Sequence, residues 1–173
     1  MEASEVLDII AGGETSKAQF KLNVTNATSI AQEIVAFANT KGGFIIIGVN
    51  DKTGAVEGLS FKDIQRINNL LTTAANEHVK SPISIETETV AVEPEKRIIL
   101  VRVPEGFRKP YKDKDGLVFV KNGSDKRVFS AAGPFSLHLP LPHSLEYSMF
   151  SLLINRTHQY RQHPIRREIG HLG

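Results

Sequence analysis

A block of basic residues is the part of this 173-residue chain whose composition points most directly to chemistry. Residues 96–127 contain 10 Lys or Arg and 4 Asp or Glu, a balance of +6, whereas residues 1–95 have a balance of −6. A concentration of positive charge inside a folded region is typical of a surface that binds nucleic acid or another polyanion. The alternative is a solvated, lysine-rich hairpin that has no partner.

The side chains of this block are suited to phosphates and bases. Ammonium and guanidinium groups contact phosphates, and Tyr111 and Phe107 could stack on bases. No base-reading helix is evident here, so the expected contacts are largely independent of sequence. The predicted binding residues are Lys96, Arg97, Arg102, Arg108, Lys109, Tyr111, Lys112, Lys114, Lys121, Lys126 and Arg127.

Other kinds of site find less support. The chain has no cysteine, which excludes disulfides, thiolate zinc sites and a cysteine nucleophile. Gly42-Gly43 is not followed by Lys-Ser/Thr and forms no Gly-x-Gly-x-x-Gly, so neither phosphate-binding loop is present. The histidines after residue 128 are spaced unlike a compact zinc site. We therefore expect no metal ligands and no cofactor, and the residues alone do not indicate an enzyme.

Hydrophobic patterning predicts the elements that carry the basic block. Helices are expected over 3–11, from Ser29 to the Gly42-Gly43 stop, and over 60–78. Strands are expected over 18–22, with Gln19 and Lys21 outward, over 44–49, and over 117–121. Residues 83–92 and 97–103 predict a hairpin. The expected fold is α+β, a mixed sheet of five or six strands with two main helices.

The chain changes character near residue 130. All 12 lysines precede residue 128, and five of the six histidines follow it. We expect a domain over 1–130 and a linker or C-terminal appendage over 131–173, with a helix over 144–162 that could pack on a second copy of the chain. No apolar run approaches the ~20 residues that span a bilayer, so no membrane association is predicted and a cytoplasmic location is expected.

One continuous motif runs from Ala36 to Asp51. It reads Ala-Phe-Ala-Asn-Thr-Lys-Gly-Gly followed by Phe-Ile-Ile-Ile-Gly-Val-Asn-Asp, which predicts a helix, a glycine reversal, a buried strand and a polar turn. Together with Glu14, Gln19-Phe20-Lys21, Lys109-Pro110-Tyr111 and Val118–Ser124, it resembles the Schlafen/AlbA-type DNA-binding domain over about residues 10–130. The residues that carry the resemblance include Phe20, Lys21, Asn39, Gly42, Gly43, Gly48 and Asp51.

The resemblance implies an α+β domain that binds nucleic acid, often as the N-terminal module of a transcriptional regulator. An older label for the same domain is a divergent AAA-type ATP-binding domain. Some vertebrate Schlafen proteins are metal-dependent endoribonucleases that use three acidic residues. By resemblance these positions fall on Glu14, Gln19 and Asp51, and Mg²⁺ or Mn²⁺ would be needed only for this alternative.

Gln19 departs from that acidic pattern. An amide carries no charge, so it weakens the binding of a hard divalent cation. Glu33 and Glu57 are the carboxylates that could substitute for it. Without such a substitute, Glu14 and Asp51 are a solvated loop carboxylate and a turn residue.

Overall fold

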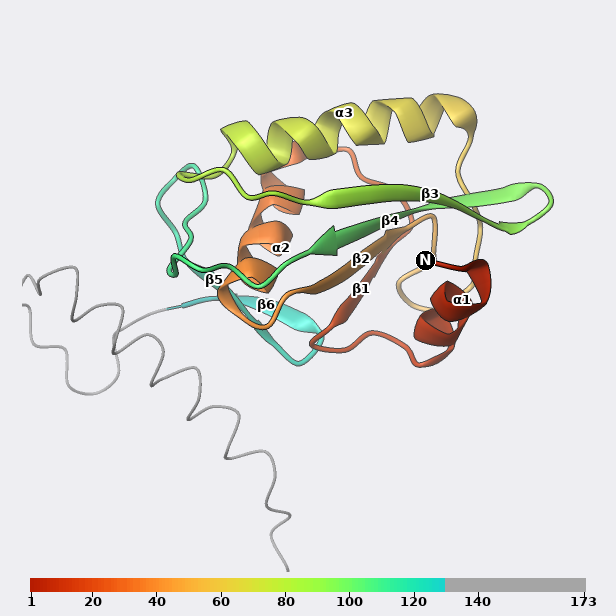
Figure 1. The fold of residues 1–173 in the computed structure, drawn as a ribbon, viewed down its shortest axis with the longest axis horizontal. Helices are drawn as coiled ribbons and strands as arrows, with labels where there is room; N and C mark the ends of the chain where they lie inside the picture. Colours follow the sequence, from red (N-terminus) through yellow and green to blue (C-terminus); the bar gives the residue numbers. More distant parts are fainter. Residues whose placement is uncertain (130–173) are drawn as a thin grey trace, which may run out of the picture. The chain divides into compact units, whose positions relative to one another are not determined.

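The structure is a computed structural model, and it describes residues 1–129 of the chain. Three helices and six strands follow one another in this region (Figure 1). The order is α1 (Ala3–Ala11), β1 (Ala18–Lys21), α2 (Ala27–Asn39), β2 (Gly43–Ile47), α3 (Phe61–Glu77), β3 (Glu86–Glu93), β4 (Lys96–Val103), β5 (Phe119–Asn122) and β6 (Asp125–Val128). The α+β fold expected from the sequence is confirmed, with the six strands divided between two sheets.

The larger sheet has the strand order β1-β2-β4-β3. Strands β1 and β2 are parallel, with Ala18 opposite Phe44, and α2 forms the connection between them. Strand β4 is antiparallel to both β2 and β3, and the β3–β4 hairpin contains a register shift near Ala91. The second sheet is the β5–β6 hairpin.

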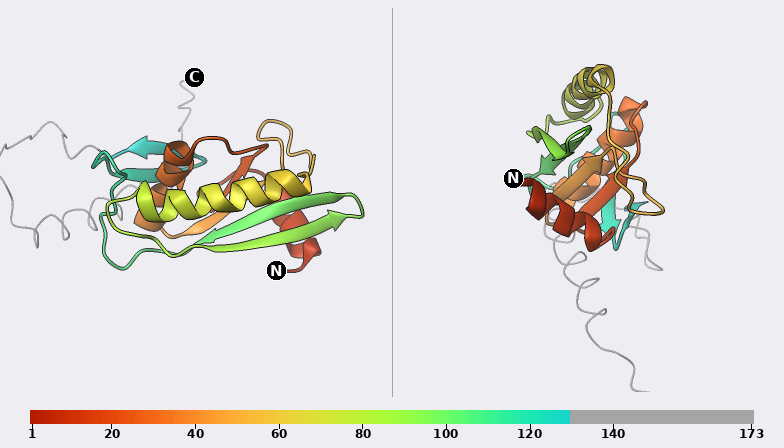
Figure 2. Two further views of the ribbon diagram at one scale, coloured as in Figure 1. Left: turned by 90° about the horizontal axis from the view of Figure 1, so that it is seen from above. Right: turned by 90° about the vertical axis from the view of Figure 1, so that its right-hand side faces the viewer.

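Helices cover both faces of the four-stranded sheet, as the end-on view in Figure 2 shows. One face packs against α2 and α3, and its core includes Ile45, Ile47 and Ile99 beneath α2 residues such as Ile34. The opposite face packs against α1 through Val6 and Ile10. Because successive strand residues alternate between the faces, the run Ile98-Ile99-Leu100-Val101 supplies both cores.

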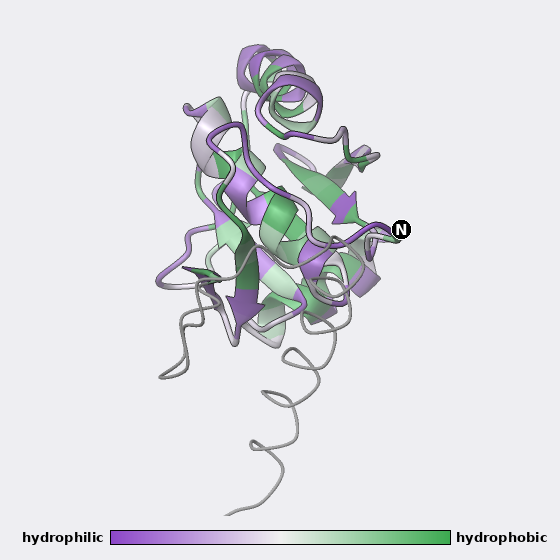
Figure 3. Cartoon of the chain, turned by 90° about the vertical axis from the view of Figure 1, so that its left-hand side faces the viewer, coloured by the Kyte–Doolittle hydropathy of each residue, from purple (hydrophilic) through white to green (hydrophobic). Residues whose placement is uncertain are grey.

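Hydropathy follows this layering. In Figure 3 hydrophobic residues concentrate in the central strands, and α3 carries mostly hydrophilic residues. Within residues 1–129, none of the helices is long and apolar enough to cross a membrane.

The local structure corrects several predicted boundaries. Helix α2 begins at Ala27, because the Asn26 side chain accepts a hydrogen bond from the Ser29 N–H at 3.0 Å and so caps it three residues earlier than expected. Strand β3 begins at Glu86 rather than at residue 83. Gln19, expected to point into solvent, is buried. The predicted appendage over 131–173, including the helix over 144–162, lies outside the described residues.

Candidate nucleic-acid interface

The loop over residues 104–118 is bound to the C-terminal end of α2. Asn39 is fully buried, and its side-chain amide donates to the carbonyl groups of Tyr111 and Phe119, each at 2.9 Å. Its Oδ1 atom accepts from the Tyr111 N–H at 2.7 Å. The Gly106 N–H donates to the Ala38 carbonyl at 2.9 Å. One motif residue therefore positions the loop that carries several predicted phosphate contacts.

The glycine pair of the motif allows close contact between backbones. Gly42 has a φ of +63°, and a Cβ atom there would lie 2.6 Å from the Val103 carbonyl oxygen. A Cβ atom on Gly43 would lie 2.5 Å from the Lys17 carbonyl oxygen. Both positions exclude larger residues because the added atom would overlap main-chain oxygen atoms. The motif is accordingly structural, and it brings α2, β2 and the loop together.

The other motif residues also support the fold. Phe20 is buried in the core beneath α1. Gly48 has a φ of +106°, and a Cβ atom there would meet the Ile98 and Leu59 side chains at 3.1 and 3.2 Å. Lys21 ends β1 and is half-buried.

The predicted basic residues do not form one patch. Lys96 and Arg97 lie at the tip of the β3–β4 hairpin, whereas the loop follows the opposite end of β4 (Figure 1). At about 3.4 Å per residue, the two ends of β4 are roughly 24 Å apart. Residues that are close in the basic block of the sequence therefore occupy opposite ends of the domain.

Acidic partners neutralise part of the block. Lys96 pairs with Glu93 at 3.1 Å, and Lys114 pairs with Asp115 at 3.0 Å. The Lys109 ammonium lies 2.5 Å from Glu105, and it also donates to the Thr40 carbonyl at the end of α2 at 2.7 Å. Four of the predicted binding residues make no ion pair within residues 1–129. They are Arg97, Arg108, Lys112 and Arg127.

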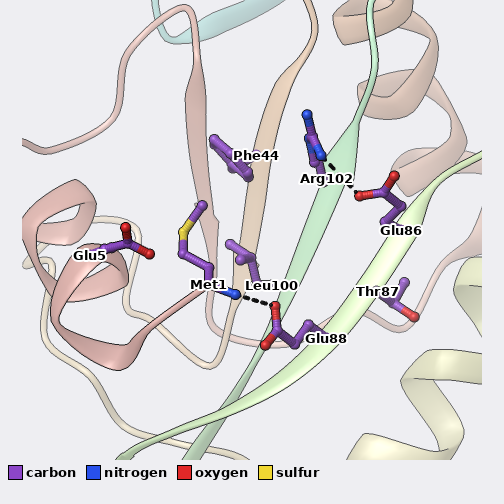
Figure 4. A pocket seen from close by; sticks show the side chains of 8 residues that line it. All are labelled: Met1, Glu5, Phe44, Glu86, Thr87, Glu88, Leu100 and Arg102. Atoms are coloured by element: carbon purple, nitrogen blue, oxygen red, sulfur yellow. Dashed lines mark hydrogen bonds and ion pairs between the residues drawn. The ribbon is translucent and has the colours of Figure 1, made fainter.

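Arg102 faces an acidic groove rather than a basic surface. This groove of about 630 Å³ lies on the α1 side of the sheet, with Phe44 and Leu100 among its lining residues (Figure 4). Three carboxylates, those of Glu5, Glu86 and Glu88, also line it, and Arg102 pairs with Glu86 at 3.2 Å. The carboxylates would repel a phosphate, so Arg102 is poorly placed to bind one.

Lys121 was predicted to contact phosphates, but its side chain is buried against α2. Its ammonium donates to Gln19 Oε1 at 2.6 Å and to the Ser124 carbonyl, and it lies 5.0 Å from the centre of the Phe37 ring. The nearest carboxylate oxygen is Glu33 Oε2 at 3.8 Å. A side chain in this position cannot reach a ligand at the surface, so Lys121 stabilises the fold.

The cluster around Lys121 balances charge inside the protein. Burial lowers the pKa of the Lys121 ammonium, and Glu33 and Glu14 oppose that effect. Glu33 is itself buried, and its Oε2 atom has no hydrogen-bond partner within the part of the chain that the structure describes. Lys126 lies 3.5 Å from Glu33 Oε1 and donates to the Ser29 carbonyl at 3.2 Å. Lys126 is thus also engaged with α2.

Tyr111 also contributes to the packing of the fold. Its backbone is held by Asn39, and its ring lies against Gly106, where a Cβ atom would be 2.1 Å from the ring. Tyr111 is therefore held by the fold and is not available for stacking on a base. Phe107, the other aromatic residue of the loop, is exposed.

The residues that resemble a nuclease site do not fit a divalent cation. Glu14 Oε1 accepts from the Gln19 side-chain amide and from the Phe20 N–H, so it is already satisfied by neutral donors. Gln19 Oε1 accepts from Lys121, whose positive charge would repel a cation. Asp51 is exposed in the turn after β2, and Glu57 accepts from the Asn50 side chain at 3.0 Å.

The other carboxylates of residues 1–129 do not form a divalent-cation site either. Within residues 1–129, no three His, Asp or Glu side chains are grouped closely enough to hold a metal ion. Glu33, the remaining candidate for a substitute carboxylate, is paired with Lys121 and Lys126. Glu33 and the two lysines therefore form an ion cluster inside the protein rather than a metal site.

The comparison with protein families agrees with this arrangement of elements. The family model described as Schlafen, AlbA_2 matches residues 14–130, about two thirds of the chain. The chain belongs to the Schlafen/AlbA_2 family. The resemblance seen in the motif residues is thereby confirmed. No curated protein matches the chain in sequence.

Solved structures share the fold of this Schlafen/AlbA_2 domain. The N-terminal domain of a RecG-related protein from Nitrosomonas europaea is 21% identical with a TM-score of 0.54, covering 82% of this chain and 99% of that one. The DIP2311 protein from Corynebacterium diphtheriae is 20% identical with a TM-score of 0.50, covering 73% of this chain. The match spans only 26% of DIP2311. At this identity the similarity establishes the fold alone.

Proposed function

We propose that residues 1–129 form a nucleic-acid-binding module that contacts phosphates from the end of the domain where the 104–118 loop meets the β5–β6 hairpin. The observation that carries the proposal is the set of cations there that make no ion pair within the described residues: Arg108, Lys112 and Arg127. Arg108 and Arg127 are exposed and Lys112 is half-buried. A guanidinium or ammonium group without an acidic partner is available to a phosphate.

Two kinds of observation support this proposal: the contacts that hold the loop and the hairpin, and the comparisons with related proteins. The loop and the hairpin are held on α2 by Asn39 and Lys126, so their cations occupy defined positions. The Schlafen/AlbA_2 family and the RecG-related relative point to nucleic acid as the partner. The finer proposal is DNA as the target and a role as the N-terminal module of a cytoplasmic transcriptional regulator, with contacts largely independent of sequence.

Charge reversal with a matched control tests the interface. One triple variant changes Arg108, Lys112 and Arg127 to Glu. The control changes to Glu three other, exposed residues, which lie in the turn after β2, at the start of α3 and at the start of β4: Lys52, Lys62 and Arg97. Both variants lose the same net charge. Lys109 is left intact because its ammonium holds Thr40 and Glu105.

We expect the wild type to bind fluorescent oligonucleotides with an affinity that falls as salt rises. The interface variant should bind more weakly, and the slope of log K against log salt should become shallower by about 2–3, corresponding to three lost phosphate contacts. The control variant should bind almost as the wild type does. Equal weakening by both variants would show that only net charge matters and would overturn the assigned surface. Absence of binding by the wild type would overturn the proposed function itself.

A further inference from the structure

Strand β3 leaves one edge of the four-stranded sheet open. Within residues 1–129 it pairs with β4 alone, so the backbone groups on its outer side have no strand partner in this part of the chain (Figure 1). The first four of its eight residues, 86–89, are all exposed. An exposed strand edge can bind an extended peptide as a further strand, because the peptide supplies the missing N–H and C=O partners.

The acidic groove lies on the α1 face of the same strand. Glu86 and Glu88 lie opposite Arg102 and Leu100 in the β3–β4 register, and Glu5 approaches them from α1 (Figure 4). The side chains that line the groove thus carry three carboxylates and one guanidinium. These carboxylates are accessible to a ligand, since 75% of the Glu86 side chain and 52% of the Glu88 side chain are exposed.

Met1 shows that the groove holds an organic cation. Its ammonium group lies 2.9 Å from Glu88 Oε2. The hydrogen bond to Glu88 raises the pKa of this ammonium against the opposing effect of burial, and the charges of Glu88 and Glu5 raise it further. Within residues 1–129, no three carboxylates are close enough together to hold a metal ion. The groove is therefore complementary to separate cations such as lysine and arginine side chains.

A second copy of β3 fits this edge poorly. Antiparallel pairing of two β3 strands would bring the Glu86 and Glu88 side chains of both copies to one seam on the same face, and like charges across strands are destabilising. A strand that places Lys or Arg beside these two residues forms opposite-charge pairs instead. Val90, two residues further along on the same face, is buried, so its neighbour on the added strand is expected to be apolar.

We propose that β3 binds an extended segment of a partner protein as a fifth strand of the sheet. The segment carries Lys or Arg at two alternate positions, which pair with Glu86 and Glu88, followed at the next alternate position by an apolar residue beside Val90. The groove repels phosphate, so this surface is separate from the nucleic-acid interface, and the inference does not depend on the proposed function.

The experiment uses the full 173-residue chain and a fluorescent peptide with capped ends, Val-Thr-Lys-Thr-Lys-Thr-Val, whose symmetry suits parallel and antiparallel pairing alike. The control peptide, Val-Thr-Thr-Lys-Lys-Thr-Val, has the same composition but places its lysines on opposite faces of a strand. Fluorescence anisotropy should show tighter binding of the first peptide. Equal affinities would show that only net charge matters and would overturn the inference.

Carboxylate-to-amide variants test the assigned side chains. Glu86→Gln combined with Glu88→Gln should weaken binding of the alternating peptide roughly 2-fold to 30-fold, because two cross-strand charge pairs are lost. Asp51→Asn combined with Glu77→Gln removes the same charge at exposed positions outside the groove and should leave the affinity unchanged. Thermal unfolding checks that each variant is folded. An unchanged affinity of the Glu86 and Glu88 variant would contradict the proposal.

Backbone pairing is tested on the peptide, which leaves the protein unaltered. Alternate residues of a strand direct their N–H groups to opposite edges. One derivative is N-methylated at the two lysines and another at the threonines, and only the derivative methylated on the edge that pairs with β3 should lose binding. Equal affinities of the two derivatives would exclude strand addition. Self-association of the chain that strengthens in the Glu86 and Glu88 variant would assign the edge to a second copy and would also overturn the inference.

Discussion

Asn39 and Tyr111 are joined by two hydrogen bonds in opposite directions. The Asn39 Oδ1 atom accepts from the Tyr111 N–H at 2.7 Å, and the Asn39 amide donates to the Tyr111 carbonyl at 2.9 Å. The side chain thereby satisfies the backbone of a loop residue 72 positions away, as a neighbouring strand would. This contact makes the C-terminal end of α2 the support for the candidate interface.

Asn39→Ala should lower the free energy of unfolding by about 2–4 kcal/mol. The substitution removes three hydrogen bonds in a buried position and leaves the Tyr111 and Phe119 carbonyl groups without their donor. Urea denaturation measures the change. Asn69→Ala, at an exposed position on α3, is the control and should change the free energy of unfolding by less than about 0.5 kcal/mol. Equal effects at the two positions would contradict the role of Asn39.

Gly42→Ala should be far more destabilising than Gly54→Ala. Both glycines have positive φ, +63° and +70°, so both substitutions incur backbone strain of about 1 kcal/mol. Only at Gly42 would the new methyl group also overlap the Val103 and Glu105 backbone, at 2.6 and 2.7 Å; at Gly54 nothing lies within 4 Å. We expect Gly42→Ala to cost more than about 3 kcal/mol or to prevent folding. Circular dichroism melts of the two variants compare them, and similar melting temperatures would refute the close approach.

Lys121→Met should lower the free energy of unfolding by about 3–5 kcal/mol, because it leaves the buried Glu33 carboxylate without its innermost cation. Replacing Glu33 as well should recover part of the loss, since the uncompensated charge is then removed. A double-mutant cycle with Glu33→Met measures this coupling by denaturation. Strictly additive effects would show that the two charges do not depend on each other.

The same ion cluster predicts a pH dependence. Burial lowers the pKa of Lys121 in the folded protein, so between that pKa and the value of about 10.4 for unfolded lysine the unfolded chain binds more protons. The contribution of Lys121 to the free energy of unfolding should therefore rise with pH in the interval just below 10.4. Denaturation of the wild type and Lys121→Met across this interval isolates the contribution, and a difference that falls with pH would have the wrong sign.

Gln19→Glu alone should not make stability depend on divalent cations. In the wild type the Gln19 amide donates to Glu14, and we expect millimolar Mn²⁺ to leave the melting temperature unchanged. A carboxylate at position 19 is a ligand type that Mg²⁺ and Mn²⁺ prefer, but the Lys121 ammonium bound at this position would still repel the ion. Thermal unfolding of the wild type and the variant with and without Mn²⁺ checks this. A rise in the melting temperature of either protein with Mn²⁺ would show that these carboxylates bind the metal.

Local patterns were sufficient to predict the α+β class. The helix periodicity around Ile64 and Ile67, the Ser60 cap on Asp63, and the apolar run of β2 each depend on residues close together in sequence. The cap of α2 was wrong by three residues, because Asn26 and Ser29 are both suitable capping residues and the sequence does not decide between them. The boundaries of elements were thus less certain than their types.

The candidate site depended on contacts that no local pattern contains. Lys121 could not be recognised as buried, because Val118, Phe119 and Val120 are all apolar and do not show which face of β5 points inward. Its partner Gln19 is 102 residues away in the chain. The sequence likewise does not show that Arg102 lies beside Glu86 and Glu88, because these two carboxylates come from the adjacent strand β3.

By itself the sequence determined the fold class, the family motif and the excess of positive charge after residue 95, because periodicity, glycine placement and composition are properties of the chain. The tertiary structure alone decided which of those charges remain available. It buried Lys121, paired Arg102 with Glu86 of the adjacent strand, and separated Arg97 from Arg108 by the length of β4. Whether a charge can meet a phosphate depends on burial and on neighbouring carboxylates, and both are set by contacts between residues distant in sequence.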